Sequence, residues 1–252
     1  MICVILAGGR GTRLSEETLM KPKPLVEAGG FPLIWHIMKN YSRFGYTEFI
    51  ILTGYKSNQI VHYFHNLKLQ QPSITFDYSE GTLKTHMSNS INWKITIVDT
   101  GIDTPTAGRL FQIKDLLKGT FSLTYGDGIS DVNISKLVSH HISSGKIATL
   151  TAVRPPARFG ALEISGDSVT RFTEKPFGEG GWINGGFFIL ESSVFEYIKD
   201  TTRNFESEAL PDLAAANQLS AFKHDGLFIA VDTLRDVEKV NEFRENYGFP
   251  WL

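Results

Sequence analysis

The first two dozen residues constrain the fold more than any other part of the chain. Ile2–Leu6 is a run of five apolar residues, rich in β-branched side chains and without polar alternation. Such a run is typical of a strand that is buried on both faces, as in a parallel sheet covered by helices. Gly8, Gly9 and Gly11 follow at once, and successive backbone N–H groups beyond the carboxyl end of a strand can form an anion-binding nest. The stretch therefore predicts a site for a polyphosphate.

Charged side chains near these glycines support phosphate binding, and two missing motifs narrow the type of phosphate site. Arg13 offers a planar fork suited to phosphate, and Lys21 and Lys23 add point charges behind it. The chain contains no Gly-Lys-Ser/Thr sequence, so the loop is not a P-loop. Residues 9–14 read GRGTRL, which does not fit the Gly-x-Gly-x-x-Gly pattern of dinucleotide-binding loops. A dehydrogenase-like domain is therefore disfavoured.

The pattern downstream predicts an α/β fold with a doubly wound, mostly parallel sheet. Apolar runs at residues 48–52 and 73–78 alternate with helical spacing at residues 31–44 and 58–67. This order would place the glycine loop at the carboxyl edge of the sheet, where ligands of such folds bind. Residues 80–92 are polar without a clear period and are expected to form a long loop. Further strands are expected at residues 93–98, 121–125 and 147–153.

Two later motifs could also belong to a phosphate-binding site, although each also has a purely structural interpretation. Gly126-Asp127-Gly128 comes directly after an expected strand, and Mg²⁺ prefers one or two carboxylates together with phosphate oxygens and water. Asp-Gly is also a common turn. Residues 106–109 (TAGR) begin an expected helix, where small residues could admit a base or a phosphate, or could serve ordinary helix packing.

The chain changes character after residue 153. Residues 158–172 read as a hairpin with a tight turn, and residues 182–190 read as another strand after a glycine-rich turn. This second part is antiparallel in character and predicts a smaller lobe attached to the sheet. A final helix is expected from residue 233 onward.

Composition excludes some classes of protein. Lysine and arginine number 25 against 27 aspartate and glutamate residues in a chain of 252, and this near-balance argues against a nucleic-acid binder. No apolar run approaches the ~18 residues of a membrane span, and no signal peptide is visible. The sequence therefore predicts a cytoplasmic protein with neither nucleic acid nor membrane as its partner.

The motifs together resemble a known family. The pattern Gly8-Gly9-x-Gly11-Thr12-Arg13 followed by Lys21-Pro22-Lys23-Pro24 resembles the sugar-nucleotide pyrophosphorylases, which are nucleotidyltransferases. The sequences of residues 13–24 and of residues 106–110 look most like those of the glucose-1-phosphate cytidylyltransferase branch. Gly160, Glu174-Lys175-Pro176 and Asn184-Gly185-Gly186 follow in the family's order. The resemblance spans residues 2–238 and implies a Rossmann-like, glycosyltransferase-A-like sheet with a small antiparallel sugar-binding lobe.

The resemblance implies an activity and a set of site residues. It implies magnesium-dependent transfer of CMP from CTP to a sugar 1-phosphate, with glucose 1-phosphate favoured, by direct in-line attack. Asp127 and Asp232 would hold Mg²⁺, and Arg13, Lys23 and Lys175 would be catalytic. The nucleotide would contact Leu6, Ala7, Gly8, Gly9, Arg10, Gly11, Thr12, Arg13, Lys23, Thr106, Gly108 and Arg109. The sugar phosphate would contact Gly160, Glu174, Lys175 and Asn184.

The resemblance also implies a single domain over residues 1–252. Its nucleotide-binding part would be 1–153, its sugar-phosphate-binding lobe 154–232 and its C-terminal helix 233–252. A homo-oligomer is common in this family. The same reaction with UTP or dTTP, or with another phosphorylated acceptor, remains open. A non-catalytic regulatory subunit would be expected to lack some of the charged residues, yet all are present: Arg13, Lys23, Asp127, Lys175 and Asp232.

Overall fold

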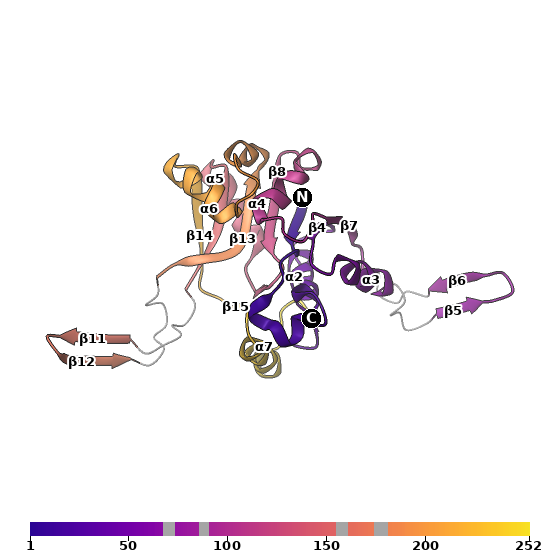
Figure 1. Ribbon diagram of the computed structural model, residues 1–252, viewed down its shortest axis with the longest axis horizontal. Coiled ribbons are helices and arrows are strands. Elements are labelled where there is room, and N and C mark those ends of the chain that lie inside the picture. The colour runs from indigo at the N-terminus through magenta and orange to yellow at the C-terminus, as the bar shows by residue number, and fades with distance from the viewer. Residues whose placement is uncertain (68–73, 86–90, 155–160, 174–180) are drawn as a thin grey trace.

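A twisted central sheet organises the protein. The computed structural model describes residues 1–67, 74–85, 91–154, 161–173 and 181–252 (Figure 1). Within them, the central sheet has the strand order β14-β10-β13-β8-β1-β4-β7. These strands are β1 (Ile2–Leu6), β4 (Glu48–Thr53), β7 (Lys94–Asp99), β8 (Thr120–Tyr125), β10 (Ala148–Val153), β13 (Ile183–Glu191) and β14 (Leu219–His224).

Most strands of this sheet are parallel, as predicted. The strands β8, β1, β4 and β7 run in one direction, and β10 is parallel to β14. The exception is β13, which lies antiparallel between β8 and β10. Residues 185–190 of β13 are all buried, so this strand belongs to the centre of the sheet. Outside the sheet, β11 (Ala161–Ser165) and β12 (Ser168–Thr173) form an antiparallel hairpin.

Helices cover both faces of the sheet, which explains the unbroken apolar run in β1. Helices α4 (Thr106–Gln112) and α6 (Phe205–Ala215) pack on the face to which Val4 and Leu6 point. Helices α2 (Leu33–Ser42), α3 (Ser57–Leu67) and α5 (Ile134–Ser144) cover the opposite face, which contains Cys3 and Ile5. Each face therefore has its own hydrophobic core. No helix among the described residues is long and apolar enough to cross a membrane.

The expectation that residues 73–78 form a strand of the parallel sheet is wrong. The strand β5 (Ile74–Asp77) pairs instead with β6 (Thr82–Thr85) in an antiparallel hairpin away from the sheet (Figure 1). The polar segment 80–92 thus contains a strand, and its residues 86–90 lie outside the described part. Phe76 and Tyr78 are 56% and 89% exposed, so this hairpin lacks the buried faces of a central strand. The place beside β4 is taken by β7.

A third cluster of buried residues lies beside the carboxyl edge of the sheet. It joins α7 (Leu234–Tyr247) to two small antiparallel pairs, one of β2 (Glu27–Ala28) with β3 (Phe31–Pro32) and one of β9 (Gly128–Ser130) with β15 (Phe228–Ala230). The final helix begins close to its predicted start. Thr233 caps it, because its side chain accepts a hydrogen bond from Asp236 N while the Asp236 carboxylate accepts one from Thr233 N. The remaining short helices are Thr12–Leu14, α1 (Ser15–Thr18), Lys23–Leu25, Lys114–Leu116 and Ser192–Tyr197.

Candidate active site

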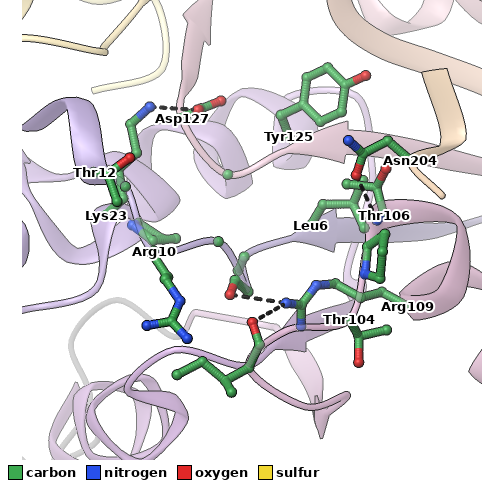
Figure 2. Close-up of a pocket in the computed structure, with 18 of the residues that line it drawn as sticks. Leu6, Arg10, Thr12, Lys23, Thr104, Thr106, Arg109, Tyr125, Asp127 and Asn204 are labelled. Carbon is green, nitrogen blue, oxygen red and sulfur yellow. Dashed lines mark hydrogen bonds and ion pairs between the residues drawn. The ribbon is translucent and has the colours of Figure 1, made fainter. Parts of the chain in front are cut away.

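A pocket of about 700 Å³ opens at the carboxyl ends of the parallel strands (Figure 2). The chain order reverses at β1, whose parallel neighbours are β4 and β8, and such a point leaves a crevice for ligands. Most of the nucleotide-binding and metal-binding residues predicted from the sequence lie together in its wall. The lining residues are Leu6, Ala7, Gly8, Gly9, Arg10, Gly11, Thr12, Lys23, Pro24, Ile102, Asp103, Thr104, Pro105, Thr106, Arg109, Tyr125, Gly126, Asp127, Asn204 and Asp232.

The three glycines of the loop serve three different purposes. A Cβ atom on Gly8 would collide with the guanidinium of Arg109, which lies directly beneath it. Gly11 has a φ of 64°, and a Cβ there would lie 2.8 Å from the Thr18 methyl carbon. A Cβ on Gly9 would meet no atom within 4 Å. The backbone at Gly9 therefore faces open space that a phosphate can approach.

Arg109 forms the floor of the pocket. Its guanidinium donates hydrogen bonds to the carbonyl oxygens of Thr53 at 2.8 Å, Gly8 at 3.1 Å and Ile102 at 3.2 Å, and to Thr100 Oγ1 at 2.6 Å. The residue is only 4% exposed. It thus links the loops that follow β1 and β7 to the last residue of β4, and it lines the pocket.

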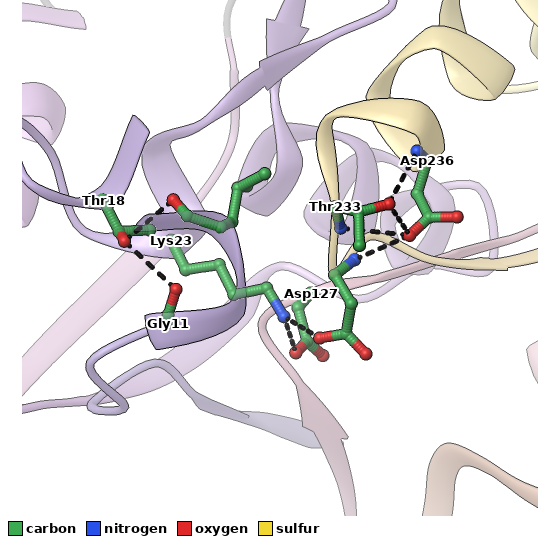
Figure 3. A network of polar contacts seen from close by, with 8 residues as sticks. Gly11, Thr18, Lys23, Asp127, Thr233 and Asp236 are labelled. Atoms are coloured by element: carbon green, nitrogen blue, oxygen red, sulfur yellow. Dashed lines mark hydrogen bonds and ion pairs between the residues drawn. The ribbon is translucent and has the colours of Figure 1, made fainter. Parts of the chain in front are cut away.

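Lys23 joins the two predicted metal ligands (Figure 3). Its Nζ lies 2.7 Å from Asp127 Oδ2 and 2.7 Å from Asp232 Oδ1. Burial alone would lower the pKa of Lys23, but the two carboxylates outweigh burial and raise it. The lysine is therefore fully charged at neutral pH.

Strand pairing brings the two aspartates together from distant parts of the chain. Asp127 immediately precedes β9, and β9 pairs with β15 so that Gly128 lies opposite Ala230. Val231 N then donates a hydrogen bond to Asp127 O at 3.0 Å, and Asp232 is the next residue. Its position before the capped start of α7 fixes its backbone.

The donor set fits a hard divalent cation that is bound together with phosphate. Within the described residues, no group of three or more histidine, cysteine, aspartate or glutamate side chains could hold a metal. Asp127 and Asp232 thus offer two carboxylates rather than a complete cage, as Mg²⁺ sites with phosphate substrates do. The remaining ligands would have to come from phosphate oxygens and water.

A second polar network closes the other end of the pocket, and the sequence did not predict it. The Tyr125 hydroxyl donates to Glu206 Oε1, and Asn184 Nδ2 donates to the tyrosine oxygen at 3.2 Å. Thr106 Oγ1 donates to Glu206 Oε2 at 2.9 Å. Burial, and then the charge of Glu206, raise the pKa of Tyr125, which stays a neutral donor. Thr106 and Asn184 are predicted site residues, whereas Glu206 has no signal in the sequence and Tyr125 has only its position beside the Gly-Asp-Gly turn.

Some predicted residues lie elsewhere or outside the described part. Gly108 does not line this pocket. It lies in helix α4 and packs against the backbone of Thr201. Asn184 reaches the pocket only through Tyr125. The backbone of Arg13 follows the glycine loop in the turn Thr12–Leu14. Gly160, Glu174 and Lys175 lie outside the described residues.

The fold is that of a nucleotide-binding α/β enzyme, and its pocket brings a glycine loop, a lysine and two carboxylates together. The chain belongs to the nucleotidyl transferase family, which matches residues 2–245, and it is an enzyme of that transferase class. The family generally uses a divalent metal. The substrates of this class are a nucleoside triphosphate and a sugar 1-phosphate.

Individual relatives agree with this assignment, and a solved structure shares the fold. The chain is 46% identical to the glucose-1-phosphate cytidylyltransferase of Salmonella typhi, with 100% of this chain and 98% of the relative covered. It is 43% identical to the "probable glucose-1-phosphate cytidylyltransferase" of Bacillus subtilis (strain 168), over 96% and 95% of the two chains. The crystal structure of HddC from Yersinia pseudotuberculosis superposes with a TM-score of 0.69 at 24% identity, covering 96% of this chain and 98% of that one. That likeness concerns the fold.

Proposed function

We propose that this protein is a glucose-1-phosphate cytidylyltransferase. It transfers CMP from CTP to α-D-glucose 1-phosphate and releases pyrophosphate, giving CDP-glucose. The observation that carries the proposal is the identity of 43–46% to relatives of that name over essentially the whole chain. The pocket supports it, because a glycine loop, a lysine and two carboxylates face one another there.

The chemistry needs positioning and charge neutralisation more than it needs a base. A phosphate oxygen of the sugar 1-phosphate is already a nucleophile at neutral pH. It attacks the α-phosphorus of CTP, and the bond from that phosphorus to the bridging oxygen breaks as pyrophosphate leaves in line. Two anions must therefore meet, and fixed positive charges lower the barrier.

We assign the charged residues separate tasks within this reaction. Lys23 stabilises the α-phosphate under attack, and Arg13 stabilises the departing pyrophosphate. Lys175 steers the incoming phosphate, Glu174 binds the sugar hydroxyls, and Gly160 and Asn184 line the sugar. Asp127 and Asp232 would hold Mg²⁺, which supplies additional positive charge at the reacting phosphates.

Pyrophosphate release tests the proposal directly. The protein is incubated with Mg²⁺, each nucleoside triphosphate in turn and a panel of sugar 1-phosphates. We expect release with CTP and glucose 1-phosphate, together with CDP-glucose as the second product. Release with UTP or dTTP instead would correct the nucleotide, and release with a different acceptor would correct the sugar. No release with any pair would indicate a binding subunit and would overturn the proposal.

Three substitutions test the assigned roles. Lys23→Ala, Lys175→Ala and Asp127→Asn should each lower kcat/KM by about a hundredfold, corresponding to about 3 kcal/mol of lost transition-state stabilisation. Lys94→Ala is the matched control, because Lys94 forms an exposed ion pair with Glu48 at 2.7 Å on the edge strand β7. If all three variants keep the kcat/KM of the control, the mechanism is wrong.

The setting and assembly of the enzyme complete the proposal. The substrates are intracellular metabolites, so we place the reaction in the cytoplasm. We also propose a homo-oligomer, for which the stacked rings of Phe76 and Tyr78 on the β5–β6 hairpin offer an exposed aromatic surface. Sedimentation velocity tests this: the wild type should sediment as an oligomer, and a monomer would contradict the proposal.

A further inference from the structure

The ammonium of Lys23 bridges the two carboxylates that are suited to a metal (Figure 3). Its distances to Asp127 Oδ2 and Asp232 Oδ1 are both 2.7 Å. The lysine side chain is 11% exposed, and those of the two aspartates are 37% and 18% exposed. Two carboxylates held this close repel each other unless a cation lies between them. Lys23 supplies that cation from within the chain.

The backbone and the stem of Lys23 are packed in place, whereas its ammonium is held by the two carboxylates alone among the contacts described above. The Lys23 backbone is fixed in the turn Lys23–Leu25, where Val26 N donates to Lys23 O at 3.0 Å. A Cβ on Gly11 would lie 3.0 Å from Lys23 Cβ and 3.4 Å from its Cδ, so the stem packs along the glycine loop. A long flexible stem lets the ammonium leave while the backbone stays in place. The glycine loop and Lys23 therefore line the same pocket, where an incoming phosphate would approach both.

Resting on the proposed function, we propose that Lys23 holds the place of the divalent metal until the nucleotide arrives. The ammonium and the cation compete for the carboxylate oxygens of Asp127 and Asp232. A triphosphate offers the displaced ammonium a new anionic partner and adds oxygen ligands for the metal. The metal is therefore bound weakly by the nucleotide-free protein and tightly together with the nucleotide. Lys23 acts here as a positioning residue that couples the two binding events.

Metal binding without nucleotide tests this coupling. Mn²⁺ has similar ligand preferences to Mg²⁺, and free Mn²⁺ can be counted by electron paramagnetic resonance. Lys23→Met removes the charge and keeps the length of the stem. We expect it to bind Mn²⁺ on the order of tenfold more tightly than the wild type, a usual size for coupling between binding events. Lys94→Met, which removes an exposed lysine of β7, should bind Mn²⁺ as the wild type does.

A double variant and thermal unfolding locate the effect. Adding Asp127→Asn to Lys23→Met should abolish the gain in Mn²⁺ affinity. Mn²⁺ should also raise the Tm of Lys23→Met without nucleotide while leaving that of the wild type nearly unchanged. Lys23→Gln, which keeps a hydrogen-bond donor between the carboxylates, replaces the methionine variant if the latter does not fold, and the same gain is expected.

Two results would overturn the proposal. The first is equal Mn²⁺ affinity in the wild type and the neutral Lys23 variants, and the second is a gain that persists with Asp127→Asn. Because these measurements require no turnover, they are independent of the test of function. Synthesis of CDP-glucose by the wild type decides the proposed activity, whereas Mn²⁺ binding decides the role of Lys23.

Discussion

At the scale of the residue, Arg109 changes how the glycine loop is understood. The sequence predicts that all three glycines serve phosphate binding. Gly8 instead makes room for the guanidinium of Arg109, and Gly54 does the same, because a Cβ there would lie 2.6 Å from Arg109 Nη1. One buried cation thus requires two glycines from separate loops. Its five donors in a rigid fork suit several carbonyl oxygens at once.

Replacing Arg109 should therefore cost stability as well as nucleotide binding. In Arg109→Met, the carbonyl groups of Gly8 and Thr53 lose a buried donor, and we expect a loss of about 3 kcal/mol in the free energy of unfolding. Urea unfolding measures this loss, and calorimetric titration with CTP measures the binding. Arg43→Met is the control, since Arg43 is exposed, donates to Asn40 Oδ1 at 3.3 Å and lies over the Phe44 ring, but contacts no buried carbonyl group through its guanidinium in the described part of the chain. An Arg109→Met variant as stable as this control would show that the guanidinium is dispensable for folding.

Individual residues show which parts of the candidate site could be predicted from the sequence. Lys23, Asp127 and Asp232 were predicted from motifs and a family resemblance, and the structure brings their charged atoms together. The partners of Arg109 could not be predicted, because a sequence does not show which backbone carbonyl groups in distant segments will face a given side chain. Glu206 gave no signal either, since its hydrogen bonds arise only when α6 packs beside β8.

At the scale of the element, two positions of the glycine loop should respond differently to substitution by alanine. Gly9→Ala should keep the Tm of the wild type, because its Cβ would point into open space. It should weaken CTP binding, since the methyl group occupies the path of the phosphates. Gly11→Ala should lower both the Tm and the affinity for CTP, because a positive φ is strained for alanine and the new Cβ approaches Thr18 at 2.8 Å.

Differential scanning fluorimetry and CTP titration of both variants measure these effects. The strain at position 11 should cost about 1–2 kcal/mol. An equal loss of Tm in the two variants would contradict the assignment of separate roles. Unchanged CTP affinity in Gly9→Ala would show that the phosphates do not approach the loop at this residue.

Elements were predicted well where local pattern decides and poorly where pairing partners decide. The buried strand β1 and the capped start of α7 follow from short-range signals, namely an apolar run and a capping threonine. The antiparallel insertion of β13 between β8 and β10 depends on partners far away in the chain. The sequence predicts a sheet strand and a loop where the β5–β6 hairpin lies, because β-propensity does not reveal which strand a segment joins.

At the scale of the whole molecule, His36 connects the two parts that position the charged centre of the site. Its Nε2 lies 2.7 Å from Ala28 O, and Trp251 Nε1 donates to its Nδ1 at 3.0 Å. Since Nδ1 accepts, Nε2 carries the proton and the ring is neutral. The cluster that contains Phe249 and Trp251 thus fastens α7, which follows Asp232, to β2. The strand β2 in turn follows the Lys23 turn closely.

The stability of the protein should therefore fall as the pH falls below about 6.5. Burial lowers the pKa of His36 from its ordinary value of 6.5, the hydrogen bond to Ala28 opposes this, and the charge of Arg244 lowers the pKa further. Above about pH 6.5 the ring is neutral in both the folded and the unfolded chain, so it contributes no pH dependence. Below that pH the unfolded chain binds a proton that the folded chain excludes, and each unit of pKa shift then costs up to about 1.4 kcal/mol.

Urea unfolding between about pH 7.5 and pH 5.5 measures the effect, with the His36→Gln variant as its internal reference. The wild type should lose more unfolding free energy over this range than His36→Gln, because glutamine does not titrate. His62→Gln, at an exposed position on α3, should keep the wild-type pH dependence. In parallel, NMR titration should show His36 protonating below pH 6.5. Two results would contradict this prediction: a His36 pKa at or above 6.5, or equal pH dependence of stability in His36→Gln and the wild type. Either would show that the buried position of His36 does not disfavour its protonation and that other groups govern the stability of the enzyme in acid.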